Sequence, residues 1–282
     1  MFKLILRAVL VVGCFVALIV FGIRSCSSHE YPLPTEAYYV NDYAGVLHPA
    51  TSEFIVRESE ALYNDTKGIK DIGGTQIVFA TFEVESDAQI ADYDKNALFR
   101  EWEIGKNDMG VLVILFFTSQ EVDEIKQYDL RQMQIEVGYH QEANYTPTLL
   151  NQIYIHTLEA YFPPDSIGYA MDYDLAYGVA SMMNELLNVA YGDIYQQTDN
   201  VIPQSEFDPW FQEDYLPNFD FTDHVNSTDE MSMLTYFLSF GGWSVDKTLF
   251  WAFAALTMLA GGFGMVKAGG GSNNDGGLFK RR

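Results

Sequence analysis

Asp108 and Glu142 are the two carboxylates of this sequence whose positions best suit a metal site. Asp108 stands just before an uncharged apolar run, 111–117, and Glu142 follows a stretch of alternating apolar and polar residues, 132–139. The first pattern is typical of a strand buried on both faces, and the second of a half-buried strand. The polar link 118–131 between them predicts an antiparallel ribbon with a long, elaborated turn. In such a ribbon the start of the first strand lies beside the end of the second, so both carboxylates share one rim of the sheet.

A hard divalent cation, Ca²⁺ or Mg²⁺, is the ligand that suits this rim. Ca²⁺ takes about six to eight oxygen ligands, which two carboxylates, backbone carbonyls and water could supply. The structural alternative is that Asp108 caps a turn before the strand and that Glu142 is simply exposed. The domain contains no Gly-x-Ser-x-Gly, no phosphate-binding loop and no pair of histidines at the spacing of zinc ligands. We therefore assign no catalytic residue.

A second group of carboxylates, Asp42, Asp172 and Asp174, is expected at the opposite rim. If the first strand, the helix after it and the second strand form a right-handed parallel crossover, the helices that start near His48 and Tyr173 both begin there. A metal site is one interpretation of these three side chains. The other is structural, with Asp42 forming a turn and Asp172 capping a helix.

The elements that must position these residues can be predicted from periodicity and turn signals. A β-branched and aromatic run predicts a strand, and apolar stripes at helical spacing predict helices. Together they indicate an α/β domain over residues 38–191, with a mixed central sheet of at least three strands flanked by four helices. The predicted strand is 75–82, and the predicted helices are 48–66, 90–102, 146–161 and 173–191.

The charge balance excludes some functions. The chain has 282 residues, with 16 Lys plus Arg against 39 Asp plus Glu, a formal net charge of −23. No Lys or Arg occurs between Gln132 and Asp246. Such a surface repels nucleic acid and attracts cations. Both cysteines, Cys14 and Cys26, lie in or beside an N-terminal apolar segment, so the folded domain has no disulfide and no thiol nucleophile.

Apolar segments near both ends predict a membrane protein. Residues 1–26 are a signal anchor or a signal peptide, and the lack of a convincing cleavage site favours the anchor. Residues 248–266 carry no charge and are expected to form a transmembrane helix. Residues 192–247 are expected to be an extended acidic stalk, and 267–282 a glycine-rich tail with a basic end. Basic residues flank the segments on their outer ends, which predicts a cell-membrane protein with both termini cytoplasmic, if the anchor is uncleaved, and the domain outside.

Three segments of the chain resemble the TPM domain family over residues 38–191. They are Val-Asn-Asp-Tyr-Ala-Gly-Val-Leu at 40–47, Asn-Asp-Met-Gly-Val-Leu at 107–112, and Ile-Glu-Val-Gly-Tyr at 135–139 with Glu142 shortly after. The resemblance implies an α/β/α sandwich. It also implies divalent-cation binding, which some members show, and it admits the acid phosphatase activity ascribed to some plant members.

Departures from the family pattern occur close to the predicted cation site. Met109 stands where the family usually has Asn, which removes one oxygen ligand, and His140 and Ala143 replace glycines near Glu142. We expect a non-enzymatic accessory protein of the cell envelope that binds divalent cations weakly and docks onto another membrane protein. The alternative is a metal-assisted phosphatase in which Asp108 and Glu142 hold the cation. The shortage of Lys and Arg near the ribbon opposes phosphate binding.

Overall fold

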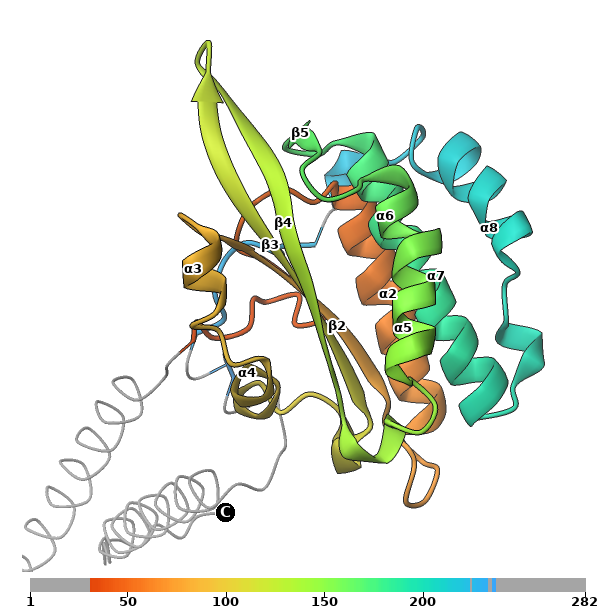
Figure 1. Cartoon of the computed structure of the whole chain (residues 1–282). Coiled ribbons are helices and arrows are strands. Elements are labelled where there is room, and N and C mark those ends of the chain that lie inside the picture. The colour runs from red at the N-terminus through yellow and green to blue at the C-terminus, as the bar shows by residue number, and fades with distance from the viewer. Residues whose placement is uncertain (1–30, 224, 233–234, 237–282) are drawn as a thin grey trace, which may run out of the picture. The chain divides into compact units, whose positions relative to one another are not determined.

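Five strands form one mixed sheet, whose strand order follows the chain (Figure 1). The first three strands run parallel, and the last two are each antiparallel to the strand before. The structure is a computed structural model, and it describes residues 31–223, 225–232 and 235–236. The strands are β1 (Val40–Asp42), β2 (Gln76–Glu83), β3 (Gly110–Val122), β4 (Ile125–Val137) and β5 (Ile167–Tyr169).

The predicted ribbon is present, but its long turn is not. Strands β3 and β4 continue through the polar link 118–131 and meet at a two-residue turn, Asp123 and Glu124. Both turn residues have positive φ angles, 52° and 66°, as the tight turns of hairpins require. The polar link forms strand because residues 120–126 face solvent on both sides of a ribbon whose tip extends away from the rest of the sheet, while Tyr128 and Leu130 are buried nearer the core (Figure 1).

Helices cover both faces of the sheet (Figure 1). One face carries four of them, and the other face carries two short ones. The four are α2 (Pro49–Thr66), α5 (Pro147–His156), α6 (Leu158–Tyr161) and α7 (Tyr173–Asn188); the two are α3 (Asp87–Ile90) and α4 (Lys95–Glu101). Short turns of helix complete the chain: η1 (Lys106–Asp108), η2 (Tyr139–Gln141), η3 (Val189–Ile194), η4 (Thr198–Asn200), α8 (Gln204–Pro209), η5 (Trp210–Tyr215) and η6 (Phe221–Asp223).

Two of the predicted helices are interrupted. The predicted helix 90–102 is replaced by α3 and α4, because the Asp94 side chain accepts hydrogen bonds from two backbone N–H groups and so starts a new helix. The predicted helix 146–161 breaks at Thr157, whose φ and ψ of −117° and −93° are not helical. The predicted helices 48–66 and 173–191 and the strand 75–82 are confirmed, with ends shifted by a few residues.

The core lies on both sides of β2 and β3. On the side of the four helices, buried residues of α2 and α7 such as Phe54 and Met182 pack on the sheet. On the other side, the aromatic rings of Phe82, Tyr93 and Phe116 pack against one another, with centroids 5.0–6.0 Å apart. Burial of both sheet faces explains why the first half of β3 has no charged residue.

The region expected to be an acidic stalk folds onto the domain as far as Tyr236. Residues Tyr31–Tyr236 form one compact unit. Phe207 and Phe211 are fully buried, and their rings lie 5.4 and 5.7 Å from that of Phe54. The prediction of an extended stalk is therefore wrong for residues 192–236, because aromatic side chains interleaved with the carboxylates give this segment an apolar face.

The two ends of this unit run side by side. The backbone N–H of Met231 donates to the carbonyl of Pro34 at 2.7 Å, and Thr35 and Glu230 form an antiparallel bridge. The N–H of Asp42 donates to the carbonyl of Ser227, so the C-terminal segment also covers the outer edge of β1. No helix in the described part of the chain is both long and apolar enough to cross a bilayer. The predicted membrane segments 1–26 and 248–266, the tail 267–282 and the end of the predicted stalk lie outside the described residues.

Candidate functional site

Asp108 and Glu142 lie on one rim of the sheet, as the ribbon predicts. Asp108 ends η1 directly before β3, and Glu142 follows η2 directly after β4. The N–H of Gly138 donates to the carbonyl of Gly110 at 2.8 Å, which joins the two strands at this rim. We call residues 105–109 and 138–142 the Asp108 rim.

Glycines allow the two segments of the Asp108 rim to approach closely. A Cβ on Gly138 would stand 2.1 Å from the carbonyl oxygen of Asp108, and one on Gly105 would stand 2.4 Å from the N of Gly110. Asn107 and Asp108 both have positive φ angles, 59° and 56°. The tight backbone therefore fixes where the Asp108 carboxylate can reach.

The two carboxylates of the rim are available to a ligand. Neither Asp108 nor Glu142 makes a side-chain hydrogen bond or ion pair with any described residue, and Glu142 is exposed. The ring of His140, an exposed residue, donates from Nδ1 to the carbonyl oxygen of Asn107 at 2.5 Å. His140 was not predicted as a site residue, and its contact with the other segment of the rim is visible only in the folded chain.

A buried amide lies directly behind the rim. Gln141 is fully buried, and its Nε2 donates to Thr75 Oγ1 at 2.7 Å. Thr75 Oγ1 is 2.5 Å from the hydroxyl of Tyr195, which donates to the carbonyl of Ile72. The Gln141 Oε1 atom has no hydrogen-bond partner among the described residues. The network joins the rim to the loop before β2 and to η3, and it leaves one buried oxygen unsatisfied.

The Asp42 carboxylate, at the opposite rim, is hydrogen-bonded within the domain. Its carboxylate accepts hydrogen bonds from Thr81 Oγ1 at 2.6 Å and from the N–H groups of Val46 and Leu47 at 3.1 and 3.0 Å. Burial raises the pKa of Asp42, and these hydrogen bonds oppose that shift. Asp42 thus forms the turn between β1 and α2, which is the structural role expected for it.

Asp172 and Asp174 are placed by the start of α7. The Asp172 side chain accepts from the N–H groups of Asp174 and Leu175, as an N-cap does, while Asp174 is exposed. The N–H of Met171 donates to the carbonyl of Val46, so α7 begins at the rim where α2 begins. The three predicted carboxylates therefore share one rim, as expected, but Asp42 and Asp172 both bond backbone N–H groups.

The geometry limits how a cation could be held. No three His, Cys, Asp or Glu side chains of the described chain gather closely enough to hold a metal ion by themselves. A cation at the Asp108 rim would need backbone carbonyls and water beside the two free carboxylates. Met109 is buried and supplies no side-chain oxygen to this rim. These features suit weak rather than tight cation binding.

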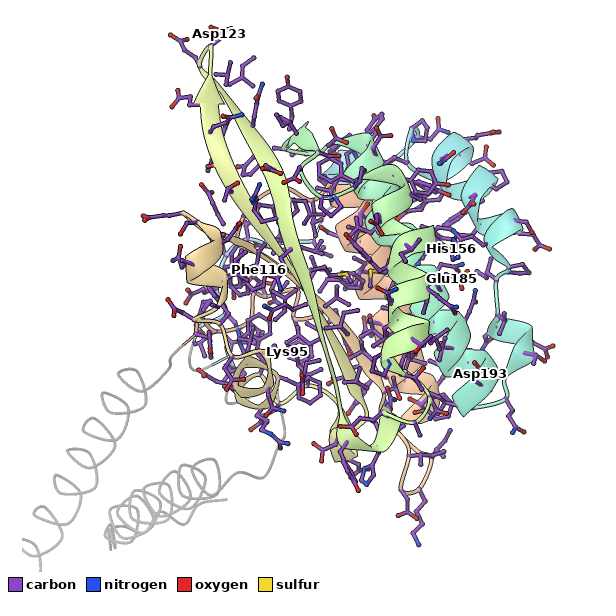
Figure 2. The ribbon with its side chains drawn as sticks, viewed as in Figure 1. Lys95, Phe116, Asp123, His156, Glu185 and Asp193 are labelled. Carbon is purple, nitrogen blue, oxygen red and sulfur yellow. The ribbon has the colours of Figure 1, made fainter. Side chains whose placement is uncertain are left out.

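A further polar cluster lies between the helices. Glu185 of α7 is near His156 of α5, as Figure 2 shows, and near Asp208 of α8. Burial raises the pKa of Glu185, Asp208 raises it further, and His156 opposes the shift. No sequence pattern indicated this cluster, because its members come from three separate helices.

Fold and rim together define a class: a mixed α/β domain that carries free carboxylates at one rim of its sheet. The family model of the TPM domain matches residues 40–172. Residues 40–172 are therefore a TPM domain, which confirms the resemblance seen in the three sequence segments. No curated protein and no solved structure matched the chain. The matched stretch ends at the N-cap of α7, so α7 and residues 189–236 lie beyond it, although they pack in the same compact unit.

Proposed function

We propose that this chain is a membrane-anchored, extracytoplasmic accessory protein whose TPM domain binds a divalent cation weakly and docks onto another membrane protein. The observation that carries the proposal is the state of Asp108 and Glu142. They share a rim, and no described residue bonds to either carboxylate. Oxygen ligands of this kind suit Ca²⁺ or Mg²⁺. The α/β/α sandwich implied by the family is consistent with helices on both faces of the sheet (Figure 1).

The two basic residues of the ribbon do not serve the Asp108 rim. Lys126 bonds to Glu83 at 2.6 Å. Arg131 bonds to Asp87, Asp129 and Asp165 at 2.8–3.0 Å. Its neighbour Gln132 pairs with Phe116, far along the strand from the rim. A phosphate group binds to Arg, Lys or a helix N-terminus in most sites. The commitment of Arg131 leaves Lys106 as the one Lys or Arg in the sequence of the rim, which favours a cation-binding role over phosphate hydrolysis.

The described domain begins and ends beside the same helix. The indole N–H of Trp102 donates to the carbonyl of Pro32, and the hydroxyl of Tyr236 donates to the carbonyl of Glu101. Both ends of the domain therefore leave beside α4. The apolar segments predicted from the sequence, 1–26 and 248–266, precede and follow these two ends along the chain.

A calorimetric titration of the full chain in detergent with CaCl₂ tests the cation site. We expect Asp108→Asn and Glu142→Gln each to weaken binding at least tenfold, because each removes a ligand charge. The control is Asp123→Asn at the tip of the ribbon, which should leave binding unchanged. Undiminished binding in the Asp108→Asn, Glu142→Gln double variant would place the cation elsewhere.

The same samples distinguish the accessory role from phosphatase activity. Each is incubated with p-nitrophenyl phosphate and Ca²⁺ or Mg²⁺. The proposal expects no turnover above that of the buffer with metal. Turnover that depends on metal and is lost in Asp108→Asn would replace the accessory role with a metal-assisted phosphatase.

Labelling of intact cells tests the orientation. Cys14 and Cys26 are first changed to Ser, and a single cysteine is then placed at Ser205, which is exposed on α8, or at Ser272 in the tail. An impermeant maleimide should label the first variant and not the second. Labelling in the reverse pattern would overturn the extracytoplasmic placement.

A further inference from the structure

One stretch of the sheet edge is open. β5 pairs with β4 only at residues 127–129. Beyond it, residues 131–137 of β4 have β3 on one side and no strand on the other. Gly138 bonds to Gly110, so the even-numbered residues before it direct their backbone groups toward β3, and the odd-numbered residues direct theirs outward.

The outward backbone groups belong to Met133, Ile135 and Val137. Lys95 Nζ donates to the carbonyl of Ile135 at 2.5 Å. The N–H groups of all three residues, and the carbonyls of Met133 and Val137, bond to no other described group. The stretch contains neither proline nor glycine, which are the residues that most often weaken pairing at an edge.

The other edge of the same sheet is covered. The outward carbonyl of Val40 in β1 accepts from Thr35 Oγ1, and the outward N–H of Asp42 donates to the carbonyl of Ser227. Both end segments of the unit Tyr31–Tyr236 thus cover the β1 edge, whereas residues 131–137 of β4 have no strand beside them on their outer side. Natural sheets rarely leave such an edge without a protecting feature, and here the features are Lys95 and a β-bulge at Arg131, where the pairing with β3 shifts by one residue.

The open stretch is complementary to itself. If two copies pair antiparallel about a two-fold axis at Ile135, each Ile135 faces its counterpart and Met133 faces Val137 of the second copy. On the other face Glu136 lies opposite Gln134, so no like charges are opposed. The Lys95 amine keeps its contact with Glu136, at 3.1 Å, when it releases the carbonyl of Ile135.

We propose that β4 residues 131–137 are a homodimer interface, through which two copies of this chain join their sheets edge to edge. The occupant is a second copy because the pairing about Ile135 matches apolar with apolar residues and avoids opposed carboxylates, although each copy carries a net charge of −23. The proposal does not depend on the cation site at the Asp108 rim. It adds a self-association to the accessory role.

Disulfide trapping tests the pairing directly in the full chain. In the Cys14→Ser, Cys26→Ser background, Ile135→Cys should give a covalent dimer on mild oxidation, because facing residues of a hydrogen-bonded pair have Cα atoms about 5.5 Å apart. Glu124→Cys at the ribbon tip is the control and should remain monomeric on denaturing gels. Equal cross-linking at both positions, or none at Ile135, would overturn the proposal.

Opposite charge changes at one position test the interface without altering the core. Gln134→Glu sets a carboxylate opposite Glu136 of the second copy in both symmetric pairs, and it should weaken the dimer roughly five- to thirtyfold. Gln134→Lys sets an amine there and should strengthen the dimer. The measurement is the molar mass of the chain in detergent by light scattering over a dilution series. A monomer at every concentration, or a dimer that neither change affects, would contradict the proposal.

Discussion

The carbonyl oxygen of Asp108 lies where a side chain on Gly138 would have to be, because a Cβ there would stand only 2.1 Å from it. Gly138→Ala is therefore expected to push the two segments of the Asp108 rim apart. Overpacking of this kind costs about 1–3 kcal/mol of unfolding free energy, which a urea titration followed by circular dichroism would measure. Gly68→Ala is the matched control, since a Cβ at Gly68 would meet nothing within 4 Å. Equal stability of the two variants would contradict the close packing.

Phe211 is expected to hold the segment α8–η5 on the domain. Its side chain is fully buried against Phe54 and Phe207, so Phe211→Ala removes a large apolar contact. The cost is about 3–5 kcal/mol if the segment stays in place, and less if it detaches. Hydrogen exchange of the full chain should show lost protection at residues 204–216 and little change in β2 and β3. Ser205→Ala, on the exposed side of α8, should leave the exchange unchanged.

Glu185 is expected to make the domain less stable as the pH rises. Burial raises its pKa, and Asp208 adds to the shift, while His156 opposes it. Protonation therefore favours the folded state. This contribution is complete below the ordinary carboxyl pKa of 4.5 and is lost as the pH rises through the higher pKa of the folded state.

Glu185→Gln should accordingly raise the melting temperature at pH 7 and flatten the dependence of stability on pH above 4.5. Glu206→Gln, which alters an exposed residue of α8, should change neither. An unchanged pH profile in Glu185→Gln would show that the cluster does not act on stability.

His48 is expected to act in the opposite sense. Burial lowers its pKa, and its ring is surrounded by those of Tyr173, Phe219 and Phe221, with centroids 5.5–6.1 Å away. The neutral ring therefore favours the folded state, and this stability is present above pH 6.5 and is lost as the pH falls toward the lower pKa of the folded state. His48→Asn keeps a side chain that can cap α2 and should flatten the thermal stability profile between pH 5 and 7. A slope equal to that of the natural chain would contradict the role of the ring.

The rim that carries Asp108 and Glu142 could be predicted because two strong strand patterns occur next to each other in the chain. The uncharged run in β3 and the alternation in β4 fix the ribbon, and ribbon geometry alone brings its two ends together. Asp42 and Asp172 were also predictable in their structural roles. The turn and the N-cap depend on backbone groups only a few residues away.

Other parts of the structure left no usable signal in the sequence. Strand β5 has three residues, too few to show an alternation. The role of Gln141 depends on Thr75, and that of Glu185 on Asp208, which are far away in the chain. The prediction of an extended stalk over residues 192–236 was wrong because the carboxylates of this segment suggest a solvated chain. Its aromatic residues instead fold it onto the domain, because they are buried against α2 and α7.

The bridge between Thr35 and Glu230 also sets an order of events during synthesis. Thr35 is synthesised early, but its partner Glu230 is synthesised almost at the end of the domain. At an elongation rate of about 5–20 residues per second, this delay is on the order of ten to forty seconds. During that time β1 has an open edge, whereas β3 and β4 can pair as soon as both are made. The ribbon therefore forms early and the β1 edge closes late, shortly before the second apolar segment is completed. A ribosome that stalls within residues 192–226 would present a domain with β1 still open to strand exchange.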